Sequence, residues 1–290
     1  MFRIGYNTNG LGSHRLPEAL DLIGDLGYEA VAITPDVGGL DPFHLRQGEV
    51  AATRAQLEDL GLAVAIETGA RFLLDPRRKH RPSLLEAEAG GRTRRVDFYR
   101  RCIDLAAGLG ADVVSLWAGS APEGVQGTLD EEPGHGLGDR LVEGLVQVLD
   151  HARGAEVRVA FEPEPGMFVE RPAGFAALLD RGGADVDDLG LTLDVGHCVV
   201  TGDEPVSGVI ERWSSRLAHV HLADCPRGLH QHVAFGEGDL DLADALGGLV
   251  RSGFSGVAAV ELSRDGHRGP DAARDAMASL RGGLKGSDVS

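Results

Sequence analysis

Eight short β-rich runs alternate with amphipathic, helix-like runs along the 290-residue chain. The predicted strands are residues 2–6, 30–34, 63–67, 112–117, 157–161, 189–193, 217–222 and 256–262. The predicted helices are residues 17–27, 49–60, 96–109, 140–153, 174–181, 206–213, 240–251 and 270–280. Strands of near-continuous Val, Ile, Leu and Ala are typical of a parallel sheet covered by helices. Eight such units in a chain of this length predict an α/β fold, a single (β/α)8 TIM barrel.

No change in composition divides the chain, so we expect one barrel domain over residues 1–284 and a flexible tail over residues 285–290. An open, doubly wound sheet is the alternative. Such a sheet normally has a glycine-rich phosphate-binding turn after its first strand, and the NTNGLG of residues 7–12 does not fit that fingerprint well. The barrel is therefore the favoured fold.

The formal net charge of −17 argues against a surface that binds nucleic acid or anionic membranes. The start of the chain lacks the layout of a signal peptide, and no apolar run approaches the ~20 residues needed to cross a bilayer. The three cysteines, Cys102, Cys198 and Cys225, are too scattered for a disulfide framework and suggest a reducing compartment. We expect a cytoplasmic protein that binds neither nucleic acid nor membranes. Whether it forms a homo-oligomer stays open.

Side chains that can bind a metal gather at the ends of the last four predicted strands. The fifth strand is followed by Glu162 and Glu164, the sixth by Asp194 and His197, the seventh carries His219 and His221, and the eighth carries Glu261 near its end. The active site of such a barrel lies at these strand ends, and charges there need a compensating partner. Two glutamates, one aspartate and one histidine suit Mn²⁺, Mg²⁺ or Co²⁺ better than a closed structural zinc site, with Zn²⁺ as a further option.

The motifs FEPEP, LDVGH, HVHLAD with a later GEGDLD, and VEL, on consecutive strands, resemble the xylose-isomerase-like TIM-barrel superfamily. Within it the chain is similar to the sugar phosphate isomerase/epimerase family, which includes D-tagatose 3-epimerase and inosose dehydratase. Endonuclease IV is a more distant resemblance. The similarity extends over essentially the whole chain, but its specific motifs lie between residues 161 and 262.

The resemblance implies one divalent metal ion and a set of site residues. The implied metal ligands are Glu162, Asp194, His221 and Glu261, and in the epimerases the two glutamates are also the catalytic acid-base pair. His197 and Arg227 match residues that contact substrate oxygens.

The chain departs from the epimerase pattern at one position. The epimerases have another substrate-binding glutamate six residues after the ligand of the fifth strand, where this chain has Phe168; Glu170 lies six residues after Glu164 instead. Either Glu164 is the ligand, or the loop and the substrate differ. We adopt Glu162 as the ligand and Glu164 as a substrate contact on the same face.

The comparison with endonuclease IV concerns two further histidines. His230 and His232 match positions that hold an additional metal in that enzyme, but it also takes histidines from strands three and four, where this chain has Glu67, Thr68 and Trp117. A three-metal phosphodiester site is therefore incomplete. We expect His232 to bind substrate; for both histidines, simple packing is the alternative.

The function implied by the resemblance is that of a divalent-metal-dependent isomerase or epimerase of a keto-sugar or related small carbohydrate. A metal next to the carbonyl acidifies the neighbouring C–H, and a glutamate removes the proton to give an enediolate. A dehydratase or lyase would use the same intermediate. A metal-dependent phosphodiesterase and a non-catalytic binding barrel are the remaining alternatives.

A long insertion over residues 69–93 follows the third predicted strand, and residues 71–82 concentrate five Arg and Lys side chains in an otherwise acidic protein. Long loops at this end of a barrel commonly cover the substrate. We therefore predict a lid that meets an anionic part of the substrate through Arg77 and Arg78. A solvated basic loop, or a contact with another subunit, is the alternative.

Overall fold

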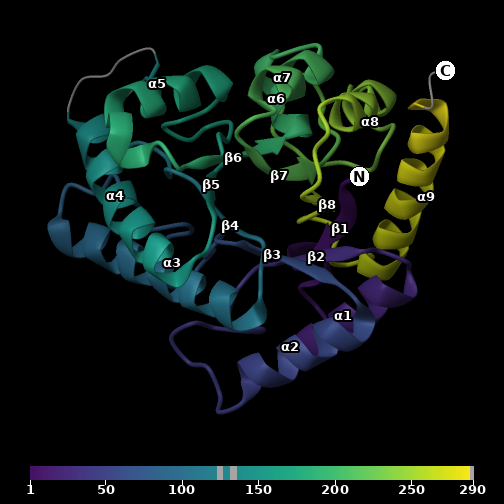
Figure 1. Ribbon diagram of the computed structural model, residues 1–290, viewed down its shortest axis with the longest axis horizontal. Helices are drawn as coiled ribbons and strands as arrows, with labels where there is room; N and C mark the ends of the chain where they lie inside the picture. The colour runs from purple at the N-terminus through teal and green to yellow at the C-terminus, as the bar shows by residue number, and fades with distance from the viewer. Residues whose placement is uncertain (123–126, 131–135, 288–290) are drawn as a thin grey trace.

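The structure is a computed structural model that describes residues 1–122, 127–130 and 136–287. Its parallel strands form a closed barrel in the order β1 to β8, with β8 paired to β1 (Figure 1). The strands are β1 (Arg3–Asn7), β2 (Ala30–Ile33), β3 (Ala63–Glu67), β4 (Val113–Leu116), β5 (Val159–Phe161), β6 (Gly190–Asp194), β7 (Leu217–Leu222) and β8 (Val257–Val260). The predicted TIM barrel is confirmed, and the open-sheet alternative is excluded because the sheet has no edge.

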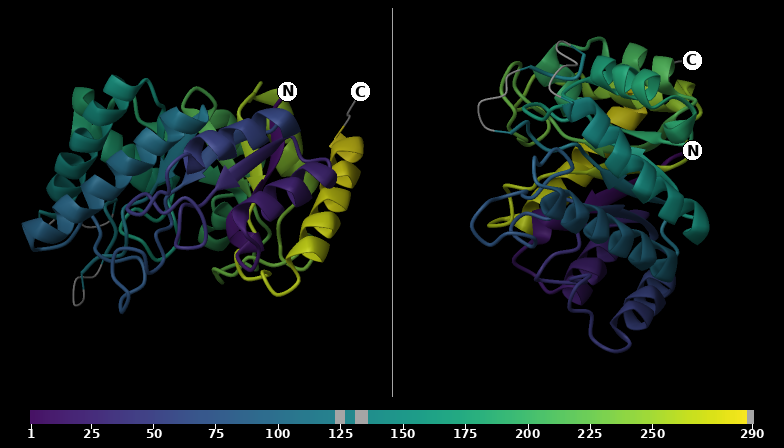
Figure 2. Two further views of the ribbon diagram at one scale, coloured as in Figure 1. Left: turned by 90° about the horizontal axis from the view of Figure 1, so that it is seen from below. Right: turned by 90° about the vertical axis from the view of Figure 1, so that its left-hand side faces the viewer.

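The helices surround this barrel (Figures 1 and 2). They are α1 (Leu16–Asp25), α2 (Glu49–Leu60), α3 (Ala89–Leu109), α4 (Leu137–Ala155), α5 (Pro172–Gly182), α6 (Val195–Thr201), α7 (Val206–Trp213), α8 (Leu242–Arg251) and α9 (Gly269–Ser287). Two short 3-10 helices, η1 (Thr8–Leu11) and η2 (Gly183–Val186), complete the described part of the chain. None of the described helices is long and apolar enough to span a bilayer.

Two helix boundaries differ from the prediction in ways that matter. Helix α3 begins at Ala89, seven residues earlier than expected, because the buried Arg95 anchors its first turns: Arg95 Nε donates to the Pro82 carbonyl at 2.7 Å and Nη2 to the His80 carbonyl at 2.8 Å. A polar segment held in this way has no apolar periodicity for sequence reasoning to detect.

At the other end of the chain, α9 continues to Ser287, past the predicted domain boundary at residue 284, and residues 288–290 lie outside the described residues. Between the predicted strand over residues 112–117 and the predicted helix over residues 140–153, residues 123–126 and 131–135 are also outside the described part.

The helix α6 was not predicted. It follows β6 directly, and the side chain of Asp194 caps it by accepting the N–H groups of Gly196 and His197 at 2.7 and 3.0 Å. A carboxylate in this position satisfies N–H groups that have no partner within the helix. One oxygen of a residue expected to bind metal is thus committed to the fold.

The two faces of each strand differ in side-chain size. On β2, Val31 and Ile33 belong to the large core cluster shared with the helices, whereas Ala30 and Ala32 belong to a small cluster made of Ala and Val from several strands. Because alternate residues of a strand point to opposite sides, the small cluster is the interior of the barrel. This interior is tight: a Cβ added at Gly190 would lie 2.8 Å from the Ala218 Cβ.

The inward face becomes polar toward the carboxyl ends of several strands. Every second residue points inward, so Glu67 comes after Ala65, Glu162 after Ala160, Asp194 after Thr192, His221 after His219 and Glu261 after Ala259. These residues form the uppermost inward layer, at the carboxyl ends of the strands, and the long loops after β3 and β8 lie on that same side of the barrel (Figure 2). The barrel thereby places a polar site above a small apolar interior.

Candidate active site

Four side chains from four neighbouring strands converge at the mouth of the barrel. One ligand atom each from Glu162, Asp194, His221 and Glu261 can be chosen such that all four atoms lie within 4.8 Å of one another. Glu162, Asp194 and His221 are buried, and Glu261 is half-buried. These are the four residues that the resemblance implied as metal ligands.

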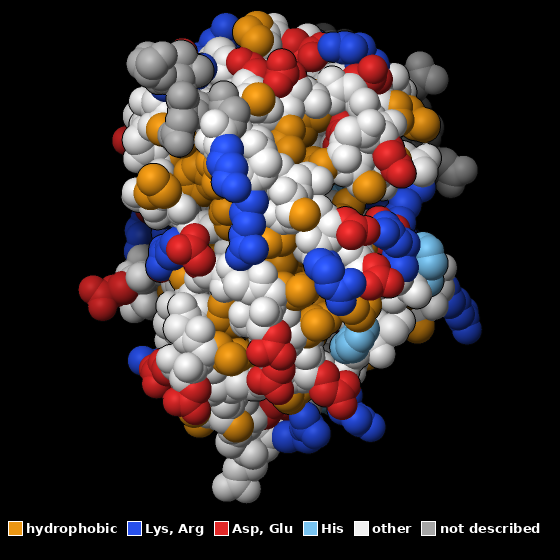
Figure 3. All heavy atoms as spheres, turned by 90° about the vertical axis from the view of Figure 1, so that its right-hand side faces the viewer, with side chains coloured by type: hydrophobic (Ala, Val, Ile, Leu, Met, Phe, Trp, Pro, Cys, Tyr) orange, Lys and Arg blue, Asp and Glu red, His pale blue; other side chains and the backbone are white. Residues whose placement is uncertain are grey.

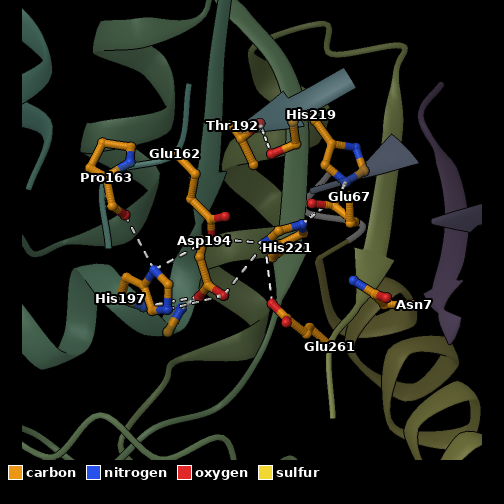
Figure 4. A network of polar contacts seen from close by, with 12 residues as sticks. Asn7, Glu67, Glu162, Pro163, Thr192, Asp194, His197, His219, His221 and Glu261 are labelled. Atoms are coloured by element: carbon orange, nitrogen blue, oxygen red, sulfur yellow. Dashed lines mark hydrogen bonds and ion pairs between the residues drawn. The ribbon is translucent and has the colours of Figure 1, made fainter. Parts of the chain in front are cut away.

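His221 lies at the centre of this group, between carboxylates on both sides (Figure 4). Its Nδ1 atom is 3.0 Å from Glu162 Oε1 and 3.3 Å from Glu261 Oε2, and its Nε2 atom is 2.9 Å from Glu67 Oε1. Burial opposes protonation, but the surrounding carboxylates raise the pKa of His221 well above its usual value. The ring therefore presents Nδ1 to the four-residue group while Glu67 holds the other nitrogen.

Asp194 supplies the best test of whether a cation fits here. Its Oδ1 atom caps α6, while its Oδ2 atom is buried and has no hydrogen-bond partner. A buried carboxylate oxygen without a donor is costly, and a divalent cation would satisfy it. Oxygen donors from three carboxylates plus one imidazole match Mn²⁺, Mg²⁺ or Co²⁺. The residues present therefore fit a divalent metal ion.

The two glutamates of the group are held differently. Asn9, in η1, donates its Nδ2 to Glu261 Oε1 at 2.8 Å, so that the second carboxylate oxygen faces His221. For Glu162, burial raises the pKa to about 7, although His221 opposes the shift. Glu164 lies outside the four-residue group but lines the same cavity, and burial next to the other acids raises its pKa well above the usual value. The geometry thus favours Glu162 over Glu164 as the ligand.

Three histidines form a second cluster next to Asp194. His197, His230 and His232 each offer a ring nitrogen within 4.8 Å of the others. The Nε2 atoms of His197 and His232 lie 3.7 and 3.6 Å from Asp194 Oδ2. Burial lowers the pKa of His197 well below its usual value and also lowers that of His230. Neutral imidazoles can both accept and donate hydrogen bonds, as a hydroxylated ligand requires.

The structure does not bring Arg227 to this site. Its exposed guanidinium pairs with Glu204 at 2.8 Å and with Asp239 at 3.5 Å, and it lines a separate surface depression. The spacing from His221 matched the family pattern, but the carboxylates of two neighbouring segments hold this arginine outside the cavity. A substrate contact from Arg227 is therefore not part of the observed geometry.

A cavity of about 370 Å³ lies over these residues. Its lining includes Glu67, Glu162, Glu164, His197, His221, His230, His232 and Glu261. The β3–α3 loop contributes Arg71, Lys79 and His80, and the His80 ring meets Trp117 edge-on at 5.2 Å. The predicted lid thus reaches the site, but Arg77 and Arg78 do not line the cavity: both are exposed, and Arg78 pairs with Asp75 at 2.7 Å.

Sequence reasoning missed Glu67 and its contact with His219. Glu67 is buried, and its Oε1 atom lies 2.8 Å from His219 Nε2 and 2.9 Å from His221 Nε2. Burial alone would raise the pKa of Glu67, but the two histidines lower it to about 2. The same rule that found the other carboxylates could have found this one, because Glu67 is the last residue of β3.

Comparison with known proteins gives one family and several relatives. The xylose isomerase-like TIM barrel family matches residues 20–282. Inosose dehydratase from Lacticaseibacillus casei is 26% identical over 165 residues, which covers 49% of this chain and 54% of that protein. 3-Dehydroshikimate dehydratase from Pseudomonas aeruginosa is 27% identical over 278 residues, which covers 93% of this chain and 39% of that protein. The chain thus spans about half of the first relative's length and less of the second's.

Solved structures agree on the fold. The structure of L-ribulose 3-epimerase superposes with a TM-score of 0.74 at 20% identity, covering 99% of this chain and 96% of that one. At this level of sequence identity, the superposition shows that the two proteins share the barrel fold. Together with the family match over most of the chain and the closed eight-stranded barrel, it confirms the resemblance seen in the motifs: the chain belongs to the xylose isomerase-like TIM barrel family.

Proposed function

We propose that the chain is a divalent-metal-dependent isomerase or epimerase of a keto-sugar or related small carbohydrate, acting through an enediolate. The observation that carries this proposal is the convergence of Glu162, Asp194, His221 and Glu261 beneath a polar cavity, with Asp194 Oδ2 left without a donor. The solved epimerase with the same fold supports it.

The residues of the chain divide the work of such a reaction. A bound divalent ion would supply the positive charge that stabilises the enediolate oxygens. Glu162 or Glu261 removes the proton from the carbon next to the carbonyl, and the same or the opposite glutamate returns it. Return to the other face of that carbon gives an epimer, whereas return to the neighbouring carbon gives an isomer. His197 and His232 hold substrate hydroxyls, while Trp117 and His80 limit the access of water.

A decisive test follows carbon-bound hydrogen. The Mn²⁺-loaded protein is incubated with a panel of ketoses in D₂O, and deuterium uptake at one carbon of one ketose is the expected result. Glu162→Gln and Glu261→Gln should each lower the rate of uptake by about 100-fold or more, with a smaller effect on ketose binding. Wild-type turnover by Glu261→Gln with metal retained would show that the acid-base assignment is wrong.

A dehydratase is the second candidate, because Glu164 lines the same cavity and burial next to the other acids raises its pKa well above the usual value, so that it could protonate a leaving hydroxyl group. The dehydratases among the sequence relatives favour it as well. In that reaction Glu162 or Glu261 removes the α-proton, the β-hydroxyl leaves as water with a proton from Glu164, and the conjugated enone that forms absorbs in the ultraviolet. Net loss of water distinguishes this function from isomerisation or epimerisation, in which the product keeps the elemental composition of the substrate apart from isotope exchange.

A further inference from the structure

Three cationic side chains line the cavity on its solvent side. Arg71 and Lys79 come from the β3–α3 loop, and Arg264 comes from the loop after β8. Lys79 and Arg264 are exposed and Arg71 is half-buried, whereas the metal-binding carboxylates lie deeper. We call these three residues the cationic rim.

The members of the cationic rim are not engaged by the protein's own acids. Among the described residues, none of the three has a carboxylate oxygen within 4.0 Å, and the Arg71 guanidinium makes only a long contact of 3.4 Å with the Asn9 carbonyl. Two other basic residues of the same loop are paired, Arg78 with Asp75 and Arg81 with Glu86. Among the described residues the Arg77 side chain has no such partner either, but Arg77 is exposed and does not line the cavity. The chain has 45 acidic and 28 basic residues, so cations left without an acidic partner around one cavity point to a ligand.

The β3–α3 loop holds its two rim residues in a defined place. The His80 backbone N–H donates to the Arg71 carbonyl at 2.6 Å, and His80 Nδ1 contacts the Gly69 carbonyl at 2.7 Å. Leu74, between them, is fully buried. These contacts close the loop back on itself and leave Arg71 and Lys79 facing the cavity, because the segment between them is anchored in the core.

We propose that the substrate carries an anionic oxygen group, a carboxylate or a phosphate, bound by Arg71, Lys79 and Arg264. Its carbonyl end lies deeper, against Glu162 and Glu261. This inference rests on the proposed function for the placement of the carbonyl end. Guanidinium groups bind carboxylates and phosphates through paired, charge-assisted hydrogen bonds, and an ammonium adds a further donor. A neutral sugar would leave all three cations without a partner.

The rival explanation is that the cationic rim only balances the negative charge of the cavity itself. Lys79 does act in this direction on Glu164, whose pKa it lowers against a much larger effect of burial. If balancing were the whole role, the wild-type protein would bind neutral and anionic ligands alike, because the acids of the cavity would already neutralise the rim. The two explanations therefore differ in selectivity.

The experiment measures the binding of three ketoses that differ only at carbon six: D-fructose, D-fructose 6-phosphate and D-fructuronate. Isothermal titration is run on metal-loaded and metal-stripped protein at low and high salt, with wild type, Arg71→Met, Lys79→Met and Arg264→Met. Arg77→Met is the matched control, since Arg77 lies in the same loop, is exposed and does not line the cavity. Circular dichroism verifies that each variant is folded.

The expected result is that at least one anionic probe binds wild type about 10-fold or more tightly than D-fructose at low salt. Each rim substitution should reduce that advantage by about 10-fold and leave D-fructose binding unchanged, whereas Arg77→Met should preserve it. The stronger of the two anionic probes identifies a phosphate or a carboxylate site. Equal binding of all three probes, or an equal loss for neutral and anionic probes, would overturn the proposal.

The same probes separate this inference from the proposed function. Deuterium uptake from D₂O tests the reaction, while the advantage of the anionic probe is measured at equilibrium and does not require turnover. An advantage that depends on the rim, with no uptake for any ketose, would leave the anion site standing and contradict the isomerase or epimerase reaction. Uptake with a neutral ketose, and no binding advantage for either anionic probe, would support the reaction and contradict the anion site.

Discussion

At the scale of single residues, the site depends on carboxylates that each have two tasks. Asp194 caps α6 with one oxygen and leaves the other free for a cation. Glu261 accepts from Asn9 with one oxygen and faces His221 with the other. A change that keeps the structural task and removes the charge therefore isolates the contribution to metal binding.

Asp194→Asn is such a change, because asparagine is also a good N-cap residue and retains a carbonyl oxygen for the Gly196 and His197 N–H groups. We expect the variant to fold with near wild-type stability and to lose most of its Mn²⁺, as measured by elemental analysis after dialysis. Asp203→Asn, on the neighbouring segment and outside the four-residue group, is the control. Full occupancy in Asp194→Asn would show that Asp194 is not a ligand.

Glu67 is expected to matter as much as a ligand without being one of the four. It holds His221 through Nε2 at 2.9 Å, and partners of this kind orient a ligating imidazole and raise its basicity. Glu67→Gln should weaken Mn²⁺ binding by about 10- to 100-fold, measured by competition with a fluorescent chelator. Glu164→Gln, which removes a cavity glutamate that does not contact His221, should bind Mn²⁺ as wild type does. Equal affinity in both variants would contradict this role for Glu67.

At the scale of elements, the β3–α3 loop is the segment that joins the site to the solvent. Its closed arrangement relies on neutral His80. Burial lowers the pKa of His80 to about 4, the nearby cations Lys79, Arg95 and Arg71 act in the same direction, and the hydrogen bond with the Gly69 carbonyl opposes them. His80 therefore resists protonation in the closed loop and would bind a proton more readily in an open loop.

The loop should therefore open more readily in acid. An exposed histidine titrates near its usual value of about 6.5, so the stability of the closed loop is complete above that pH and falls as the pH drops toward 4. Hydrogen exchange of residues 71–82, corrected for the intrinsic rate, should be faster relative to the rest of the chain at pH 5 than at pH 7. His80→Gln, which cannot titrate, should show no such difference. The same pH dependence in His80→Gln would assign it to another group.

At the scale of the whole molecule, the barrel combines a tight, small-residue interior with a polar upper layer. The −17 charge is not gathered into one acidic patch on the face that carries α9, where acidic and basic side chains are interspersed (Figure 3). Stability is therefore expected to depend on the packing of the interior more than on surface charge.

Gly190 tests that expectation. A Cβ at this position would lie 2.8 Å from the Ala218 Cβ and 3.3 Å from the Val159 carbonyl oxygen, neither of which can move without moving a strand. Gly190→Ala should destabilise the fold by about 1–3 kcal/mol. The control is Gly154→Ala in α4, where a Cβ meets no atom within 4 Å. This change should raise the free energy of unfolding by about 0.5–1 kcal/mol, because alanine has the higher helix propensity. Urea titrations should show a loss of stability for Gly190→Ala and a gain for Gly154→Ala. A gain in both variants would mean that the interior relaxes around the added methyl group.

The sequence by itself determined the fold and the four candidate metal ligands, because both follow from local patterns. Alternating β-rich and amphipathic runs define eight units, and the residues after the last four strands converge once those strands close into a barrel. Sequence spacing could not place side chains whose partners come from distant segments. Glu204 and Asp239 hold Arg227 outside the cavity, and Asp75 pairs with Arg78, whereas Arg71 and Lys79 line the cavity. Only the tertiary structure decided these, since competing contacts determine which way a long side chain points.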